Sequence, residues 1–275
     1  MHRAVWWLVV VLAWAAIGGA GYYWWRQQRA EREAPPPPAP AAATPAQPEA
    51  QVEPPIRHPI EAAKEQGTEE SAKETSPLPP LSDSDKLVQD SLAGLAGRDS
   101  LEAFLNTTGL VRRVVATVDN LPRKKAPEKM WPVKPTAGRF ATTPKDGEVF
   151  LDPDNYRRYE PFLALMEAVD TRKLVVLYIR FYPLFQQAYE ELGYSKRYFN
   201  DRLIEAIDDL LATPEVKGPI KLARPWIMYE YANAGLEASS AGQKILIRMG
   251  SENAARVKGK LREIRQQVTR QAVTQ

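Results

Sequence analysis

A proline-rich stretch without aromatic residues limits which part of this chain can form a core. Residues 26–80 contain 13 of the 24 prolines, and their large aliphatic side chains are only Val52, Ile56, Ile60 and Leu78. Such a composition cannot bury enough apolar surface to offset the entropy lost on folding. We therefore predict that residues 26–80 are a disordered linker, with a reach on the order of 40 Å as a flexible coil.

At about Leu81 the composition changes to that of a folded domain, and residues 81–275 fit one domain of ordinary size. The apolar periodicity is mainly helical. Capping-box spacings at Ser82 and Asp99 predict two helix starts, and the apolar face of a third helix runs from Leu110 to Val118. Further helices are predicted over 153–169, 171–192, 199–212, 234–249 and 252–270.

Two stretches of this domain are predicted to be non-helical. Leu121–Pro144 contains five prolines and is expected to be irregular. Residues 220–222 and 226–231 flank Arg224-Pro225 and fit a small β-hairpin. The predicted fold class is therefore mostly α, with about seven helices and at most one small hairpin.

The predicted helix 171–192 is apolar on every side. Arg180 is the only charge between Leu174 and Tyr189, and a helix of this kind is typically buried. The stretch is short for a membrane span, and Pro183 interrupts it. We interpret it as the central helix of the domain, with a re-entrant or second membrane segment as the alternative.

The chain begins with an apolar segment of membrane-spanning length. From Ala4 to Trp25 there are 22 consecutive residues without a charge, with tryptophan or tyrosine at both ends. A helix of this length crosses a hydrocarbon core of about 30 Å, and aromatic rings prefer its two interfaces. We predict that residues 1–25 are a transmembrane anchor. The alternative is a cleaved signal peptide, which Gly18-Gly19-Ala20 would also fit.

The orientation of this segment is left open by its flanking charges. Arg26, Arg29 and Arg32 outnumber Arg3, and a literal count of these charges favours a cytoplasmic domain. A short positive tail before an apolar run and a long following domain favours export. We expect the exported side, with the cytoplasmic side as the alternative.

The residue types that are missing exclude several classes of enzyme. The chain has no cysteine, so thiolate nucleophiles, disulfides and cysteine-held metals are ruled out. Its two histidines, His2 and His58, both precede the predicted domain, which removes histidine-based acid–base and metal chemistry there. We therefore expect no catalytic residue, no metal site and no cofactor.

Carboxylates leave one enzymatic alternative. Asp201, Glu205 and Asp208 share a face of the predicted helix 199–212. Glycoside cleavage needs only two carboxylates at a suitable separation, so an enzyme acting on cell-wall glycan is the alternative to a binding module. A solvated helix face is the simpler interpretation.

Charge is unevenly distributed along the predicted domain. Residues 111–145 and 243–275 are strongly basic, whereas residues 146–242 are acidic overall. Either the basic segments pack beside the acidic centre, or they form a surface for an anionic partner. Nucleic acid is not expected as a partner, because no binding motif is recognisable.

Tyrosines are concentrated between Tyr156 and Tyr231, and two interpretations of them are open. Their hydroxyls could find internal partners in a core, or some of them could line a cleft. If Arg180 is buried, its charge needs a carboxylate partner. Our hypothesis is that this partner is Asp201 or Asp208. The candidate ligand or partner surface comprises Tyr178, Arg180, Tyr182, Gln186, Asp201, Arg224 and Trp226.

Several long motifs resemble one bacterial family. They include RRVVATVDNLPRKKAP at 112–127, LDPDNYRRYEPFLALMEAVDT at 151–171 and YFNDRLIEAIDDLLATPEV at 198–216. The chain is similar over nearly all of 78–265 to the domain of unknown function 3014 family. That resemblance implies a single-pass membrane protein with a proline-rich spacer, and it brings no assigned activity, ligand or catalytic residue.

Together these features predict a bacterial inner-membrane protein with one spanning helix, a linker and a helical domain, which is expected in the periplasm. The domain is expected to be a non-catalytic binding or scaffolding module for a protein or an anionic envelope component. A cytoplasm-facing membrane adaptor is a further alternative, and the oligomeric state is left open.

Overall fold

The computed structural model describes residues 55–60 and 77–273, all within one compact unit that spans Glu53–Gln275. The predicted anchor at residues 4–25 and most of the predicted linker lie outside the described residues. Within 55–60 and 77–273, no helix is both long and apolar enough to cross a membrane. The membrane anchor and the domain boundaries therefore stay predictions.

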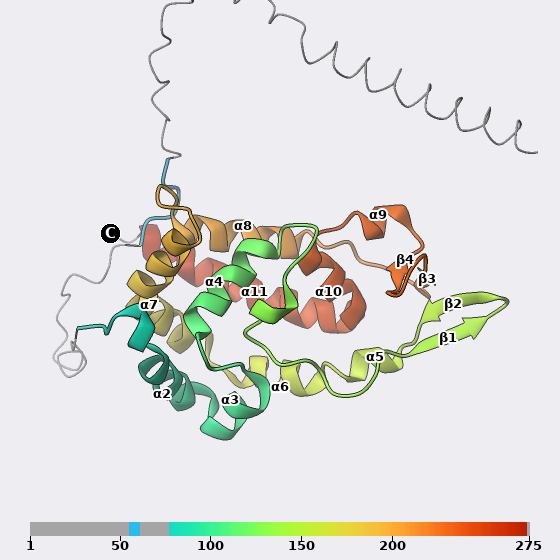
Figure 1. The fold of residues 1–275 in the computed structure, drawn as a ribbon, viewed down its shortest axis with the longest axis horizontal. Helices are drawn as coiled ribbons and strands as arrows, with labels where there is room; N and C mark the ends of the chain where they lie inside the picture. Colours follow the sequence, from blue (N-terminus) through green and yellow to red (C-terminus); the bar gives the residue numbers. More distant parts are fainter. Residues whose placement is uncertain (1–54, 61–76, 274–275) are drawn as a thin grey trace, which may run out of the picture. The chain divides into compact units, whose positions relative to one another are not determined.

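The described part of the chain is mostly helical, as predicted (Figure 1). Two short 3-10 helices, η2 (Leu81–Asp83) and η3 (Glu128–Met130), accompany the α-helices. These are α2 (Asp85–Ala96), α3 (Arg98–Phe104), α4 (Leu110–Asn120), α5 (Asp154–Arg157), α6 (Glu160–Ala168), α7 (Thr171–Glu191), α8 (Phe199–Leu211), α9 (Ala234–Glu237), α10 (Ala241–Met249) and α11 (Ser251–Val273).

Helix α7 lies at the centre of the main hydrophobic core. It packs against α4 and α11, and Phe181, Leu184 and Tyr189 are almost completely buried in it. The helix runs through Pro183, whose ring faces the exposed side. Its start is capped by Asp170, whose carboxylate accepts the backbone N–H of Lys173. The interpretation of 171–192 as the central helix is therefore confirmed.

Several helix boundaries differ from the predictions. The predicted helix 153–169 is divided into α5 and α6, and the predicted helix 234–249 is divided into α9 and α10. The capping boxes predicted at Ser82 and Asp99 are wrong, because α2 and α3 begin after Ser84 and Gly97. A capping box does form at Ser240, where the backbone and side chain of Gln243 are the reciprocal partners.

A four-stranded antiparallel sheet replaces the single hairpin that was predicted. Its strands β1 (Thr142–Lys145), β2 (Glu148–Leu151), β3 (Lys221–Ala223) and β4 (Glu230–Tyr231) lie in sequence order. The β3–β4 hairpin is the predicted one. The β1–β2 hairpin was missed because prolines suggested an irregular segment up to Pro144. Its two-residue turn, Asp146-Gly147, has positive φ at both positions, which matches the twist of a tight hairpin.

Candidate functional site

The predicted surface residues occupy two different places in the fold. Five of them lie on α7 and α8, namely Tyr178, Arg180, Tyr182, Gln186 and Asp201. Arg224 and Trp226 lie instead in the turn between β3 and β4. Figure 1 shows α7 and these strands at opposite ends of the helical domain. The structure thus joins Tyr178, Tyr182 and Gln186 to one another and to the start of α8, and it separates the turn from them.

On α7, the two tyrosines of the predicted surface have partners inside the domain. The Tyr178 hydroxyl donates to Asn200 Oδ1 at 2.9 Å, and the Tyr182 hydroxyl donates to Gln186 Oε1 at 3.1 Å. Their rings meet edge to face with centroids 5.9 Å apart. Burial raises the pKa of both hydroxyls well above the ordinary tyrosine value. This is the arrangement that the core interpretation of these tyrosines predicts.

Gln186 joins the end of α7 to the beginning of α8. Its Oε1 accepts the backbone N–H of Phe199 at 2.8 Å, and its Nε2 donates to the carbonyl of Arg197 at 3.0 Å. An otherwise unpaired N–H in the first turn of α8 is satisfied in this way. Gln186 therefore positions the N-terminal residues of α8, including Asn200 and Asp201.

The N-terminal turn of α8 contacts a short segment of the predicted linker. The Asp201 carboxylate accepts the backbone N–H of Arg57 at 3.1 Å and that of His58 at 2.8 Å. Asn200 Nδ2 donates to the His58 carbonyl at 2.9 Å. Residues 55–60 thus cover Asp201. Figure 1 shows the segment beside the connection from α7 to α8, where Tyr198 contacts it.

The three carboxylates considered for catalysis all have partners from this chain. Asp201 accepts the two linker N–H groups, Glu205 pairs with Arg202 at 2.7 Å, and Asp208 pairs with Arg265 at 2.6 Å. Arg180 lies with its guanidinium over the ring of Phe181, 5.5 Å from the centroid. The hypothesis that Asp201 or Asp208 pairs with Arg180 stays a prediction.

Charge pairs connect the basic segments with the acidic centre of the domain. From the basic C-terminal segment, Lys244 pairs with Glu237, Arg256 with Glu160 and Glu167, and Arg265 with Asp208. From the other basic segment, Arg112 pairs with Glu191 at 2.9 Å. These contacts favour the interpretation that the basic segments pack beside the acidic centre.

The β3–β4 turn exposes three consecutive large apolar side chains. The exposed fractions are 85% for Trp226, 81% for Ile227 and 72% for Met228. We name residues 224–229 the apolar turn. Exposed apolar groups in such a cluster mark interaction surfaces more often than isolated ones do.

The apolar turn is held in shape from one side by Arg224. The Nε of Arg224 donates to the Ile227 carbonyl at 3.0 Å, and its guanidinium lies over the Tyr229 ring, 5.2 Å from the centroid. The Tyr229 ring also contacts Phe140, at a centroid distance of 5.7 Å. The sequence indicated Arg224 and Trp226, whereas Ile227, Met228 and Phe140 were missed because their exposure depends on the tertiary fold.

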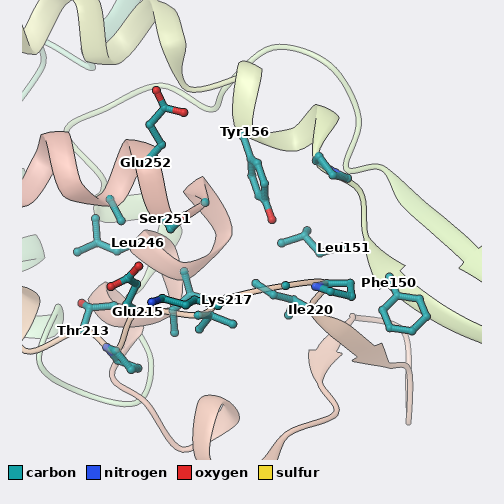
Figure 2. A pocket seen from close by; sticks show the side chains of 18 of the residues that line it. Phe150, Leu151, Tyr156, Thr213, Glu215, Lys217, Ile220, Leu246, Ser251 and Glu252 are labelled. Atoms are coloured by element: carbon teal, nitrogen blue, oxygen red, sulfur yellow. The ribbon is translucent and has the colours of Figure 1, made fainter.

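A cavity of about 1210 Å³ lies between the β1–β2 hairpin, residues 213–220 and the start of α11. Figure 2 shows the Tyr156 side chain extending into it, with apolar residues such as Leu151 and Ile220 nearby. Acidic and basic side chains are equally represented in its lining, including Glu215, Lys217, Glu252 and Lys258. Lys258 Nζ donates to the Thr213 carbonyl at 2.5 Å, and burial lowers the pKa of its ammonium group. This lining has no charge bias that would select a ligand.

A family relationship covers much of the described domain. A family model described as protein of unknown function (DUF3014) matches residues 110–265, which is more than half of the chain. The matched region runs from the start of α4 into α11 and contains α7, α8 and the apolar turn. No curated protein and no solved structure matches.

Proposed function

We propose that this chain, which belongs to the DUF3014 family of proteins of unknown function, is a membrane-anchored binding protein that captures a protein partner through its apolar turn. The observation that carries the proposal is the exposure of Trp226, Ile227 and Met228 next to one another. Full burial of each such side chain is worth about 1.5–3 kcal/mol, a gain that folding of this domain leaves unused.

The composition of the apolar turn favours a protein as the partner. Tryptophan, tyrosine, methionine and arginine are enriched in protein interfaces. Tryptophan, tyrosine and arginine are also the residues most common in binding hot spots. All four types occur in the turn, as Arg224, Trp226, Met228 and Tyr229. The hydrogen bond and ring contact of Arg224 fix the turn before binding, which lowers the entropy cost of association.

A non-catalytic role is supported by the engagement of the domain's candidate carboxylates. Asp201, Glu205 and Asp208 each accept donors from the same chain. A carboxylate whose oxygens accept donors from its own chain is held away from the contacts with a substrate that acid or base catalysis requires. Replacing each of the three by its amide checks this role, because a glycan-cleaving enzyme would lose activity with its fold retained.

The membrane anchor and the exported location are supported by sequence alone. The apolar run from Ala4 to Trp25 and the linker that follows would hold the domain near a bilayer. A reporter fused after Gln275 that is active on one side of the membrane only would establish the orientation. Mass spectrometry of the mature chain would detect loss of the first 20 residues and so contradict the anchor.

Photo-crosslinking in cells tests the binding role of the apolar turn. A photoreactive residue at Trp226 of the full chain should yield a discrete crosslinked protein. The control position is Val176 on α7, which is 61% exposed and lies outside the turn. Equal crosslinking from both positions, or lipid adducts alone from Trp226, would contradict a protein partner at the turn.

A further inference from the structure

The linker segment 55–60 contacts the domain mainly through its backbone. Its N–H groups at Arg57 and His58 donate to Asp201, and its His58 carbonyl accepts from Asn200. The Tyr198 hydroxyl accepts the N–H of Ile60 at 2.7 Å and donates to the Ile60 carbonyl at 2.6 Å. The side chains of Asp201, Asn200 and Tyr198 thus bind the segment, which bends at Arg57 and His58, by its backbone groups.

One side chain of the segment adds specificity to these backbone contacts. Ile60 is 7% exposed and joins the main hydrophobic core, whereas Ile56 in the same segment is 59% exposed. The two isoleucines have the same side chain, so their different burial shows that the domain binds the side chain at position 60 and not the one at position 56. Peptide recognition commonly combines these two kinds of contact, with backbone hydrogen bonds for affinity and a pocket for selected side chains.

The prolines of the segment suit this mode of binding. Pro59 has no N–H, and the N–H groups of the segment that donate hydrogen bonds belong to residues 57, 58 and 60. A proline also biases the preceding residue, His58, towards an extended backbone. The segment therefore loses less conformational freedom on docking than a flexible peptide would.

We infer that residues 55–60 are a docking motif and that the N-terminal turn of α8, with Tyr198, is the peptide-binding site that fastens the linker to its own domain.

The fastening point lies well inside the predicted linker 26–80. About 30 linker residues then separate it from the membrane segment instead of about 55. Fully extended, these lengths reach roughly 100 Å and roughly 190 Å. The docking therefore limits how far from the membrane the domain can search.

The limit on reach depends on the proposed membrane anchor, whereas the docking does not. The chain itself can supply the ligand at a high effective concentration, because residues 55–60 and α8 belong to one polypeptide. Docking within one molecule is accordingly independent of protein concentration. Exchange of the segment between two copies would instead weaken on dilution.

Amide hydrogen exchange of the full chain tests the docking motif. The amides of Arg57, His58 and Ile60 should exchange at least about tenfold more slowly than in a free peptide of residues 53–60. Ile60→Ser should abolish this protection, and the matched control Ile56→Ser should keep it. Protection of α7 amides, measured in the same samples, reports whether each variant remains folded.

A second variant keeps the test decisive if Ile60→Ser loosens the core. Tyr198→Phe removes only the hydroxyl that binds the Ile60 backbone, and the ring can keep its contact with Tyr182. It should lower protection at residue 60 with the domain intact. Free-peptide exchange rates at 57, 58 and 60 in the unaltered chain, or protection that disappears on dilution, would overturn the inference. Neither readout involves Trp226, so failure of the docking inference is distinguishable from failure of the proposed partner binding.

Discussion

Asp119 on α4 and Arg202 on α8 form an ion pair that is almost withdrawn from solvent. Asp119 Oδ1 lies 3.1 Å from Arg202 Nε, and the side chains are only 7% and 12% exposed. The other oxygen of Asp119 pairs with Arg123 at 2.8 Å and accepts the Tyr194 hydroxyl at 3.3 Å. The pair connects α4 with the helix that carries the docking site for residues 55–60.

Removing Asp119 should destabilise the domain strongly, because the nearly buried charge of Arg202 would keep only a carboxylate partner that is 64% exposed, Glu205. We expect Asp119→Ala to lower the free energy of unfolding by about 3–5 kcal/mol, measured by chemical denaturation. The matched control is Asp208→Ala, whose pair with Arg265 is 48% and 38% exposed. That change should cost no more than about 1 kcal/mol. Equal losses would show that the Asp119 pair is no more important than a surface pair.

Two glycines, one at the junction of α10 and α11 and one inside α11, should respond to alanine with opposite signs. Gly250, between α10 and α11, has φ 86° and ψ 158°, and an added Cβ would lie 2.8 Å from the Tyr156 ring. Gly250→Ala should cost at least about 2 kcal/mol from backbone strain and overpacking. Gly259 lies inside α11 with open space around it, so Gly259→Ala should stabilise by about 0.5–1 kcal/mol. Thermal denaturation of both variants checks the pair, and a shared sign would contradict this local geometry.

High pH should unfold the domain through its buried tyrosines. Burial raises the pKa of Tyr178, Tyr182 and Tyr231 in the folded state, whereas a tyrosine in the unfolded chain has a pKa of about 10. The folded state therefore keeps protons that the unfolded state loses, and stability falls as the pH rises above about 10. Above about pH 10, each such tyrosine lowers the free energy of unfolding by about 1.4 kcal/mol per pH unit.

Denaturation curves across that pH range measure the slope. Tyr178→Phe should reduce it by about one tyrosine's share, since phenylalanine cannot ionise. An unchanged slope in this variant would mean that Tyr178 is not withdrawn from water in the folded state.

Much of the helical fold could be predicted from the sequence, because long apolar periodicities survive in any packing. Helix α8 begins at its predicted residue, and α7 spans almost its predicted range despite Pro183. The sheet was underestimated because β1 and β2 are four residues each, and a proline in β1 concealed the Asp146-Gly147 turn signal.

The site was harder to predict than the fold. Tyrosine and carboxylate patterns identified side chains able to bind, but spacing cannot tell which partner each one has. Asp201 was one of two candidate partners for Arg180, and no sequence pattern indicated its bonds to the backbone of Arg57 and His58, more than a hundred residues earlier. Long-range contacts of this kind leave no local signal in either segment.

The central claim is that the apolar turn binds a protein partner, and the affinity of the Trp226→Ala variant tests it most directly. Trp226 is 85% exposed, so the substitution should change the stability of the domain by no more than about 0.5 kcal/mol. A hot-spot residue costs at least about 2 kcal/mol on truncation, so affinity for the partner crosslinked at this position should fall by about 30-fold or more. The control Val176→Ala should leave affinity unchanged. Equal affinities of the Trp226→Ala variant and the unaltered chain would contradict the account.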